Sequence, residues 1–312
     1  MTDIKIGALC WNQYSDFKSL FDAGLRAERL GYDTLWTWDH VYPIVGDSNG
    51  PNYEGWLTIT AWATATERIR VGLMVGANTF RAPTLTAKMA TTLDHISSGR
   101  AILGIGGAWF EEEHEAFGLD FGSGFPERLR WLGEALPLMR GMRDGTEPSA
   151  AGDHYRAQNV RNLPAPVQAH LPICIGGGGE QVTLKLVARY GDMNNIGGTP
   201  DEMAHKEEVL LRHCETVGRD PATIERTTGI GTVFIRDDPK EAQRLFEAAF
   251  ARNRVARLWA DQPVGTVEQV VEKLAPKVRL GYRHLIAGVP ADYDEESMTR
   301  FATEVKPLLE QL

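Results

Sequence analysis

The chain is poor in cysteine, has no excess of positive charge and contains no long hydrophobic run. Its three cysteines, Cys10, Cys174 and Cys214, lie far apart without metal-ligand spacing, which predicts a reduced, cytoplasmic protein without disulfides or a metal site. The net charge of −9 argues against a general nucleic-acid binder, although a local positive pocket could still hold an anionic cofactor. No stretch approaches the ~20 apolar residues of a membrane helix, and Asp3 and Lys5 precede any apolar run. We therefore expect no membrane span and no signal peptide.

Several familiar catalytic signatures are also missing. There is no Gly-x-Ser-x-Gly elbow, no Walker lysine after a glycine-rich turn and no internal repeat. The 312 residues, 43% of them hydrophobic and 24% charged, are ordinary for a globular enzyme. This length suits one large α/β barrel or two smaller domains.

Four consecutive glycines join a short apolar run, residues 173–175, to a helical pattern that follows. A strand, a glycine turn and a helix start place bare N–H groups and a helix N-terminus at one point, which favours a phosphate group. A tight turn without a ligand is the alternative. The residues that we predict to bind the phosphate of a cofactor are Gly176, Gly177, Gly178, Gly179, Glu180 and Gln181.

Eight apolar segments alternate with helical patterns along the chain. The predicted strands are residues 4–9, 32–36, 69–77, 101–105, 171–175, 192–196, 227–235 and 283–287. Such alternation indicates parallel crossovers, and at this length a closed (β/α)8 TIM barrel fits best, with an open doubly wound sheet as the alternative. We predict one domain over residues 1–312, with insertions after strands 4 and 7. One predicted helix, residues 239–259, is unusually long.

Chemically useful residues follow several of these strands. Asp39 and His40 come after the second strand, and the fourth ends at Gly106 before Trp109. Active sites of TIM barrels lie at the carboxyl ends of the strands, so these residues should meet the glycine turn at one mouth. A histidine there can give or take a proton near neutral pH, whereas a purely structural histidine is the alternative. Asp39 could orient the ring or bond a cofactor hydroxyl.

Two other groups are given structural interpretations. The acidic run Glu111–Glu115 lacks a second histidine cluster, so we interpret it as a solvated helix start and not as a metal site. Cys10 and Cys174 have no activating base nearby in the sequence, so we expect buried packing residues.

The order and spacing of several short motifs resemble the bacterial luciferase-like family of flavin and deazaflavin oxidoreductases. The motifs are Gly31-Tyr-Asp-Thr-Leu-Trp36, Asp39-His40, Arg70-Val-Gly72, Arg81-Ala-Pro83, Leu93-Asp94, Ser98-Gly-Arg100, Leu103-Gly-Ile-Gly106, Trp109 with Glu113 and Phe117-Gly118, Arg128, and Pro172 to Ala188 ending in Tyr190-Gly-Asp192. Within the family, the end of the second strand resembles the branch that uses coenzyme F420, a deazaflavin with a phosphate and a polyglutamate tail.

The resemblance implies roles for individual residues. Asp39 would bond the cofactor, and His40 would be the proton donor or acceptor beside the carbon that transfers the hydride. The third strand would end in a bulge with a cis peptide bond, pressed against the ring through Met74, Val75, Gly76 and Ala77. Gly107 and Ala108 would line the ring edge, and the glycine turn would take the phosphate.

Two positions differ from the sugar-phosphate dehydrogenase of this branch. Trp109 stands where that enzyme has a catalytic glutamate, and Ile44 where it has a tryptophan. With Trp11, Trp38 and Trp56, these residues predict a less polar organic substrate, and Trp11 and Trp109 are the candidate substrate contacts.

Three functions are compatible with these residues. The first is an F420-dependent oxidoreductase, the second a monooxygenase that uses reduced FMN, and the third a non-catalytic flavin-binding barrel. The expected partner is a small-molecule substrate, with no nucleic acid and no membrane, and family analogy suggests a homodimer.

Overall fold

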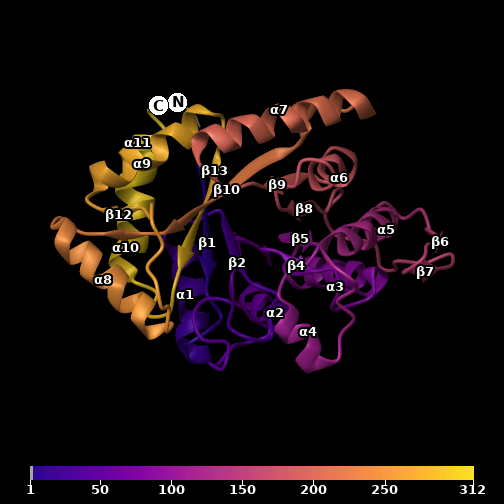
Figure 1. Cartoon of the computed structure of the whole chain (residues 1–312), viewed down its shortest axis with the longest axis horizontal. Coiled ribbons are helices and arrows are strands. Elements are labelled where there is room, and N and C mark those ends of the chain that lie inside the picture. The colour runs from indigo at the N-terminus through magenta and orange to yellow at the C-terminus, as the bar shows by residue number, and fades with distance from the viewer. Residues whose placement is uncertain (1–2) are drawn as a thin grey trace.

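The computed structural model describes residues 3–312 and contains a closed parallel barrel surrounded by helices (Figure 1). The main sheet has nine strands, but β3 and β4 are two parts of one interrupted strand, which leaves eight barrel positions. The barrel strands are β1 (Lys5–Cys10), β2 (Thr34–Thr37), β3 (Arg70–Leu73), β4 (Gly76–Ala77), β5 (Ala101–Gly106), β8 (Ile173–Gly176), β9 (Met193–Asn195), β10 (Glu225–Thr232) and β13 (His284–Val289). Because β1 pairs with β13 and β3 pairs with β5, no edge stays open. The predicted TIM barrel is confirmed.

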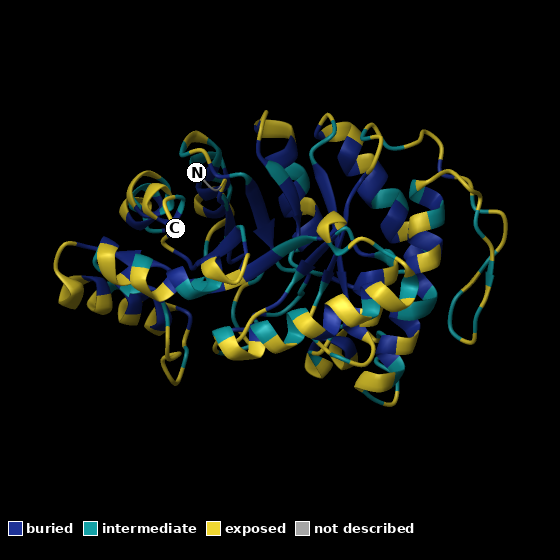
Figure 2. Cartoon of the chain, turned by 90° about the horizontal axis from the view of Figure 1, so that it is seen from above, coloured by how far each residue is buried: buried dark blue, intermediate teal, exposed yellow. Residues whose placement is uncertain are grey.

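The helices cover the outside of the barrel, with buried positions facing the strands (Figure 2). They are α1 (Phe17–Arg29), α2 (Gly55–Ala65), α3 (Pro83–Ile96), α4 (Glu111–Phe117), α5 (Phe125–Arg143), α6 (Thr183–Tyr190), α7 (Pro200–Val217), α8 (Pro239–Arg252), α9 (Val267–Arg279), α10 (Glu295–Arg300) and α11 (Lys306–Leu309). Side chains fix several helix starts: Asp16 caps α1, and Thr199 and Thr266 form capping boxes on α7 and α9. Among the described residues, no helix combines the length and apolarity required to cross a bilayer.

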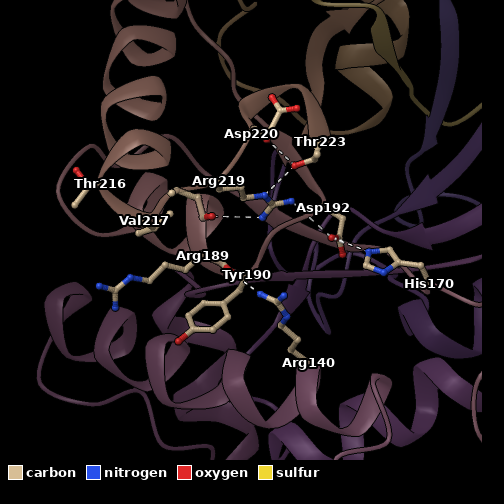
Figure 3. Close-up of a pocket in the computed structure, with 12 residues that line it drawn as sticks. Arg140, His170, Arg189, Tyr190, Asp192, Thr216, Val217, Arg219, Asp220 and Thr223 are labelled. Carbon is tan, nitrogen blue, oxygen red and sulfur yellow. Dashed lines mark hydrogen bonds and ion pairs between the residues drawn. The ribbon is translucent and has the colours of Figure 1, made fainter.

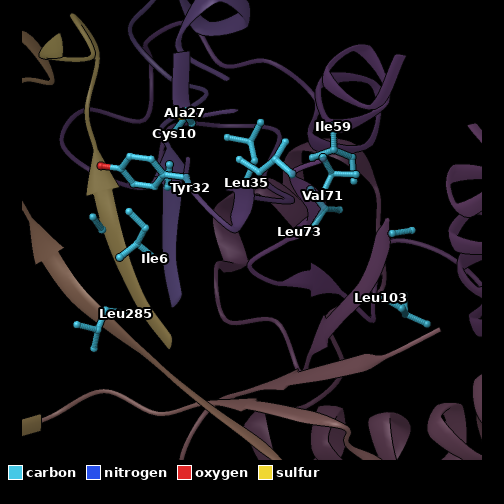
Figure 4. Close-up of a cluster of buried hydrophobic side chains, with 14 of the residues drawn as sticks. Ile6, Cys10, Ala27, Tyr32, Leu35, Ile59, Val71, Leu73, Leu103 and Leu285 are labelled. Atoms are coloured by element: carbon cyan, nitrogen blue, oxygen red, sulfur yellow. The ribbon is translucent and has the colours of Figure 1, made fainter. Parts of the chain in front are cut away.

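The main hydrophobic core lies between the strands and the helices that cover them. Ile6, Leu35, Val71 and Leu103 are buried in it, and Figure 4 shows them side by side on successive strands. Along each strand every second side chain points into the barrel, and Trp36 and Cys174 are among the side chains that fill it. Burial raises the pKa of the Cys174 thiol, and likewise that of Cys10, to about 12. Both cysteines are thus buried packing residues, as predicted.

Two segments add elements to the regular alternation. Between α5 and β8, strands β6 (Ala150–Ala151) and β7 (Arg156–Ala157) form a small hairpin. Between β10 and α9, strands β11 (Phe234–Ile235) and β12 (Val264–Gly265) pair with each other, and α8 connects them.

The structure corrects two predicted elements. The predicted strand 69–77 is interrupted, because the Met74–Val75 peptide bond is cis and the ladder resumes only at Gly76. The predicted helix 239–259 is too long, since α8 ends at Arg252. There the Asn253 amide donates to the Ala249 carbonyl, and the next residue turns into the left-handed region with φ of 52°.

Candidate active site

A cavity of about 330 Å³ opens at the carboxyl ends of the barrel strands. It is lined by residues that follow β2, β3, β5, β8 and β9. The structure brings most of the predicted site residues to this one cavity, namely Asp39, His40, Met74, Val75, Gly76, Ala77, Gly107, Ala108, Trp109, Gly176 and Gly177. The glycine turn and the Asp39-His40 pair therefore share one mouth.

His40 is held by a buried carboxylate on α4. Its Nδ1 lies 2.7 Å from Oε1 of Glu113, and Oε2 of Glu113 accepts a hydrogen bond from the Val41 N–H at 3.0 Å. The Glu113 side chain is only 1% exposed. The interpretation of Glu111–Glu115 as a solvated helix start is thus wrong for Glu113 and the neighbouring His114, which both point inward, while the remaining three glutamates are exposed.

This contact determines which nitrogen of His40 is available for chemistry. A carboxylate can only accept, so Nδ1 carries the proton and donates to Glu113. Among the described residues, Nε2 of His40 has no hydrogen-bond partner. The ring lies edge-on to Trp109, with ring centroids 5.6 Å apart, and borders the cavity. The imidazole can therefore accept or donate a proton through Nε2.

Asp39 is buried and forms a two-pronged ion pair with Arg81. Its Oδ2 and Oδ1 lie 2.7 and 3.1 Å from Nη1 and Nη2 of Arg81, and Oδ2 also accepts from the Ala77 N–H at 2.9 Å. The same Arg81 Nη2 donates to Oε1 of Glu54 at 3.0 Å. Asp39 thereby connects the end of β2 to β4, directly beside the cis peptide bond. The bidentate geometry holds the buried carboxylate in one orientation.

Val75 lies against two of the cavity glycines. A Cβ on Gly106 would lie 2.8 Å from Val75 Cγ2, and one on Gly176 would lie 2.7 Å from the same atom. Real Cβ atoms do not approach other carbons so closely, so side chains are excluded at both positions. The bulge and the two strand ends form a flat wall of backbone and small apolar groups.

The glycine turn continues from this wall towards α6. The Gly177 N–H donates to the Asn195 carbonyl at 3.3 Å, and the Asn194 amide donates to the carbonyls of Ile175 and Gly177 at 2.9 and 3.2 Å. Within residues 3–312, no acceptor is found for the N–H groups of the four residues that follow, which are Gly178, Gly179, Glu180 and Gln181. These four residues lie outside the cavity lining. Their unpaired N–H groups form a cradle of backbone donors.

Lys206 of α7 lies beside this cradle. A Cβ on Gly178 would lie 3.2 Å from the Lys206 ammonium nitrogen. His213 contacts the Glu180 carbonyl at 2.8 Å, and His205 lies 3.2 Å from the Glu180 carboxylate. The turn is therefore fixed from α7 while its N–H groups stay available to an anion.

Of the four tryptophans that were predicted to surround the substrate, two lie at the cavity and two are buried elsewhere. Trp38 and Trp109 line the cavity. Trp11 is only 1% exposed and packs against Trp38, with ring centroids 5.2 Å apart, while Trp56 is buried in the main core. Trp11 is not among the residues that line this cavity, and its contact with substrate stays a prediction.

Sequence reasoning gave no role to four residues of this site, Glu113, Arg81, Phe125 and Asn195. Glu113 and Arg81 belong to the family motifs, which was the only available signal. Phe125 and Asn195 had no distinguishing pattern in the sequence.

Comparison with known proteins gives a family and relatives. The model of a family described as luciferase-like monooxygenase matches residues 7–258. An F420-dependent glucose-6-phosphate dehydrogenase of Intrasporangium calvum is 28% identical over 333 aligned residues, covering 95% of this chain and 96% of that protein. A protein of the same description from Kineococcus radiotolerans is 29% identical and covers 93% of this chain and 92% of its own.

Solved structures share the fold at low sequence identity. An F420-dependent secondary alcohol dehydrogenase, in complex with an F420-acetone adduct, superimposes with a TM-score of 0.84 at 20% identity and covers 99% of both chains. A monooxygenase from Streptomyces bottropensis has a TM-score of 0.81 at 19% identity, covering 98% of this chain and 99% of its own. These similarities establish the barrel architecture independently of the sequence motifs.

Proposed function

The chain belongs to the luciferase-like monooxygenase family, and from this premise we propose that it is an F420-dependent oxidoreductase. It transfers a hydride between coenzyme F420 and a small, fairly apolar organic substrate, with His40 as proton donor or acceptor. The observation that carries this proposal is the position of the His40–Glu113 pair beside the cavity wall formed by the bulge and the glycines. The two relatives named as F420-dependent dehydrogenases, which align over nearly the whole chain, support the choice of cofactor.

The residues at the mouth fit a flat ring with a phosphate-bearing tail. Gly106 and Gly176 keep the wall beside Val75 free of side chains, as a ring stacked on that wall requires. The N–H groups of residues 178–181 and the nearby Lys206 would hold the phosphate. Bound F420 supplies two-electron hydride transfer, which a deazaflavin carries out with little reactivity towards oxygen.

The chain's own residues handle the proton. Glu113 fixes the His40 ring through Nδ1, so Nε2 is the atom that takes a proton when the substrate is oxidised and returns it when the substrate is reduced. Asp39, tied to Arg81 and to the Ala77 N–H, holds β4 and the bulge in place as the backing of the ring. Trp109 and Phe125 line the cavity with aromatic surface.

The lining of the cavity supports an uncharged substrate. None of the described residues that line it is lysine or arginine, and Trp38, Ile44, Trp109 and Phe125 supply apolar surface. A sugar phosphate would find no cationic partner there, whereas a neutral alcohol or carbonyl compound would bury its apolar part. We therefore propose that the substrate differs from the glucose 6-phosphate named for the relatives.

Titration of the purified protein with F420 and with FMN tests the cofactor. We expect F420 to bind at least tenfold more tightly than FMN, because the two relatives that align over nearly the whole chain are named as F420-dependent. Tighter binding of reduced FMN, with turnover that depends on oxygen, would favour the monooxygenase alternative. The family description and the Streptomyces bottropensis structure both name a monooxygenase. Binding of either cofactor without turnover in a broad substrate screen would favour the flavin-carrying barrel.

The variant H40A tests the proposed catalytic residue. It should keep F420 binding and lose most turnover, because the ring supplies the proton transfer and not the cofactor site. The matched control is H95A, since His95 is exposed on α3 and contacts only the Ala165 carbonyl. Unchanged turnover in H40A would remove His40 from the mechanism.

We also propose a homodimer that forms through α2 and its neighbour α3. No residue of α2 is charged, although Leu57 on it is 74% exposed, and Leu85 on α3 is 52% exposed. A helix with no charged residue on its outer side is typical of a covered surface. Light scattering should give twice the chain mass for the wild type and the monomer mass for L57K/L85K. A monomeric wild type would contradict the proposal.

A further inference from the structure

A second and larger cavity lies at the opposite end of the barrel from the proposed active site. It has a volume of about 870 Å³ and is lined by residues that precede β8, β9 and β10, together with the carboxyl-terminal ends of α5, α6 and α7 (Figure 3). Because the strands are parallel, their amino-terminal ends meet here, whereas the mouth described above lies at their carboxyl ends. Nothing in the proposed reaction uses this cavity.

Three arginines from different helices line it. Arg140 lies in the last turn of α5, Arg189 in the last turn of α6, and Arg219 directly after α7. Arg140 Nη1 donates to the Arg189 carbonyl at 2.7 Å, and Arg219 Nη1 lies 3.5 and 3.4 Å from the carbonyls of Val187 and Ala188. The carbonyls at the carboxyl end of α6 thus accept hydrogen bonds from two guanidinium groups, as expected for a helix carboxyl terminus.

These contacts use only part of the available donors. Nη2 of Arg140 and the whole guanidinium group of Arg189 have no acceptor among residues 3–312, and Nη2 of Arg219 comes only within 3.9 Å of Asp192. Figure 3 shows Arg219 and Arg140 on opposite sides of the α6 end, with Arg189 directed away from His170. The cavity therefore offers several unused N–H groups, on Arg140 and Arg219, which are held by the end of α6, and on Arg189, whose guanidinium group is exposed.

The neighbouring carboxylates are already occupied. Asp192 accepts from Arg143 Nη1 at 2.7 Å and from the Ile173 N–H at 2.9 Å, and it lies 2.8 Å from His170 Nε2. Asp220 accepts from the Ala222 N–H at 2.9 Å. Burial, and then the like charges of Arg140 and Arg143, lower the pKa of Arg219, against the opposing effect of Asp192. Asp144 is also held, since its carboxylate lies 2.7 Å from Arg143 Nε and 3.6 Å from Arg140 Nε.

We propose that this cavity binds an anion with two or more adjacent phosphate groups. A guanidinium group presents paired N–H donors that match phosphate oxygens, and three such groups on separate helices suit an anion with several charged oxygens better than a single carboxylate. Thr223 and Tyr190 also line the cavity, and the Thr223 hydroxyl accepts from Arg219 Nε at 3.0 Å and donates to the Asp220 carbonyl at 2.7 Å. A free oligophosphate and the diphosphate of a nucleotide share this chemistry. The site is independent of the F420 assignment.

Isothermal titration of the full chain with pyrophosphate at low salt tests the proposal. We expect saturable binding, weakened about tenfold in R189Q and in R219Q, because each removes one charge-assisted contact. R212Q is the matched control, since Arg212 on α7 is 62% exposed and pairs only with Glu208, and it should bind like the wild type. K206Q reports on the glycine turn: pyrophosphate bound there would lose affinity in K206Q, whereas pyrophosphate bound beside the three arginines would not.

The outcomes separate the two anion sites. Absence of pyrophosphate binding, equal binding by R189Q and R212Q, or a loss confined to K206Q would each overturn the proposal. R219Q removes contacts to α6 and its folding must be checked by circular dichroism, whereas Arg189 is exposed and makes no side-chain contact within the described chain, so R189Q decides the matter if R219Q unfolds. A parallel titration with adenosine diphosphate assigns the source: tighter binding than pyrophosphate indicates a nucleotide, and equal binding a free oligophosphate.

Discussion

Nδ1 of His40 and Oε1 of Glu113 lie 2.7 Å apart, although 73 residues separate them in the chain. The carboxylate is buried and its second oxygen is held by the Val41 N–H, so it cannot turn away from the ring. The pair fixes the orientation of the imidazole and leaves Nε2 as the nitrogen that is available for proton transfer. Glu113 is therefore a positioning residue for the proposed proton transfer.

The variant E113Q should lower kcat about 10- to 100-fold while F420 affinity stays within threefold of the wild type. The amide oxygen can still accept from the ring, but the amide NH2 group would face the Val41 N–H, so the ring is held less firmly for proton transfer through Nε2. Steady-state kinetics across pH 5–9 check this. E115Q is the control, because Glu115 is exposed on the same helix. A wild-type profile for E113Q would show that the contact is structural only.

Breaking the Asp39–Arg81 ion pair should cause a large loss of stability, part of which a second substitution should restore. In R81M the Asp39 carboxylate, 2% exposed, would keep the Ala77 N–H but lose its charged partner, which costs about 3 kcal/mol. Adding D39N removes the unpaired charge, so D39N/R81M should unfold at a higher denaturant concentration than R81M. Chemical denaturation measures both. Additive losses in the double variant would show that the two residues act independently.

The barrel and its mouth could be predicted because they depend on local patterns. Apolar runs of strand length alternate with segments of helical periodicity. The four consecutive glycines mark a turn whose backbone N–H groups are not all used by a strand or a helix. The placement of Asp39 and His40 at the same mouth followed from the parallel topology alone.

Other features depend on contacts between distant segments. Four glutamates and a histidine in a row, residues 111–115, carry no periodic signal, so only the packing of α4 on the loop at His40 shows that Glu113 is buried. The end of α8 was missed because Arg254, and not a glycine, adopts the left-handed conformation, while Gln13 of a distant loop bonds Asn253. The cis bond at Met74–Val75 followed from family resemblance and not from any pattern of residue types.

Glu225 at the start of β10 should make stability depend on acidic pH. Burial opposes its ionisation, but hydrogen bonds and charge from His284 at 2.9 Å and Lys5 at 3.0 Å prevail and lower its pKa from 4.5 to about 2. Because the folded-state pKa is lowered, this contribution is complete above pH 4.5 and is lost as pH falls from 4.5 through 2. It amounts to about 3 kcal/mol at neutral pH.

The comparison of E225Q with the wild type isolates this effect. The difference in free energy of unfolding should be largest at pH 6–7 and should shrink steadily between pH 4.5 and 2, as measured by urea denaturation at each pH. E208Q is the control, since Glu208 is 69% exposed and its only ion pair is 4.0 Å long. A difference that does not change with pH would mean that shape and packing, and not ionisation, explain the role of Glu225.

The contact between Gly176 and Val75 gives a steric test of the cavity wall. An alanine at position 176 would place its Cβ 2.7 and 3.0 Å from the two methyl groups of Val75, so G176A must displace the bulge and should cost about 1–3 kcal/mol of stability. F420 affinity should fall about tenfold with it, because the displaced wall no longer accepts a flat ring. V75A removes the clashing methyl groups, so V75A/G176A should be more stable than G176A and should regain part of the affinity. G229A controls for the loss of glycine itself, because a Cβ there meets no atom within 4 Å. If V75A does not rescue G176A, the requirement for glycine at this position has a cause other than the approach of Val75.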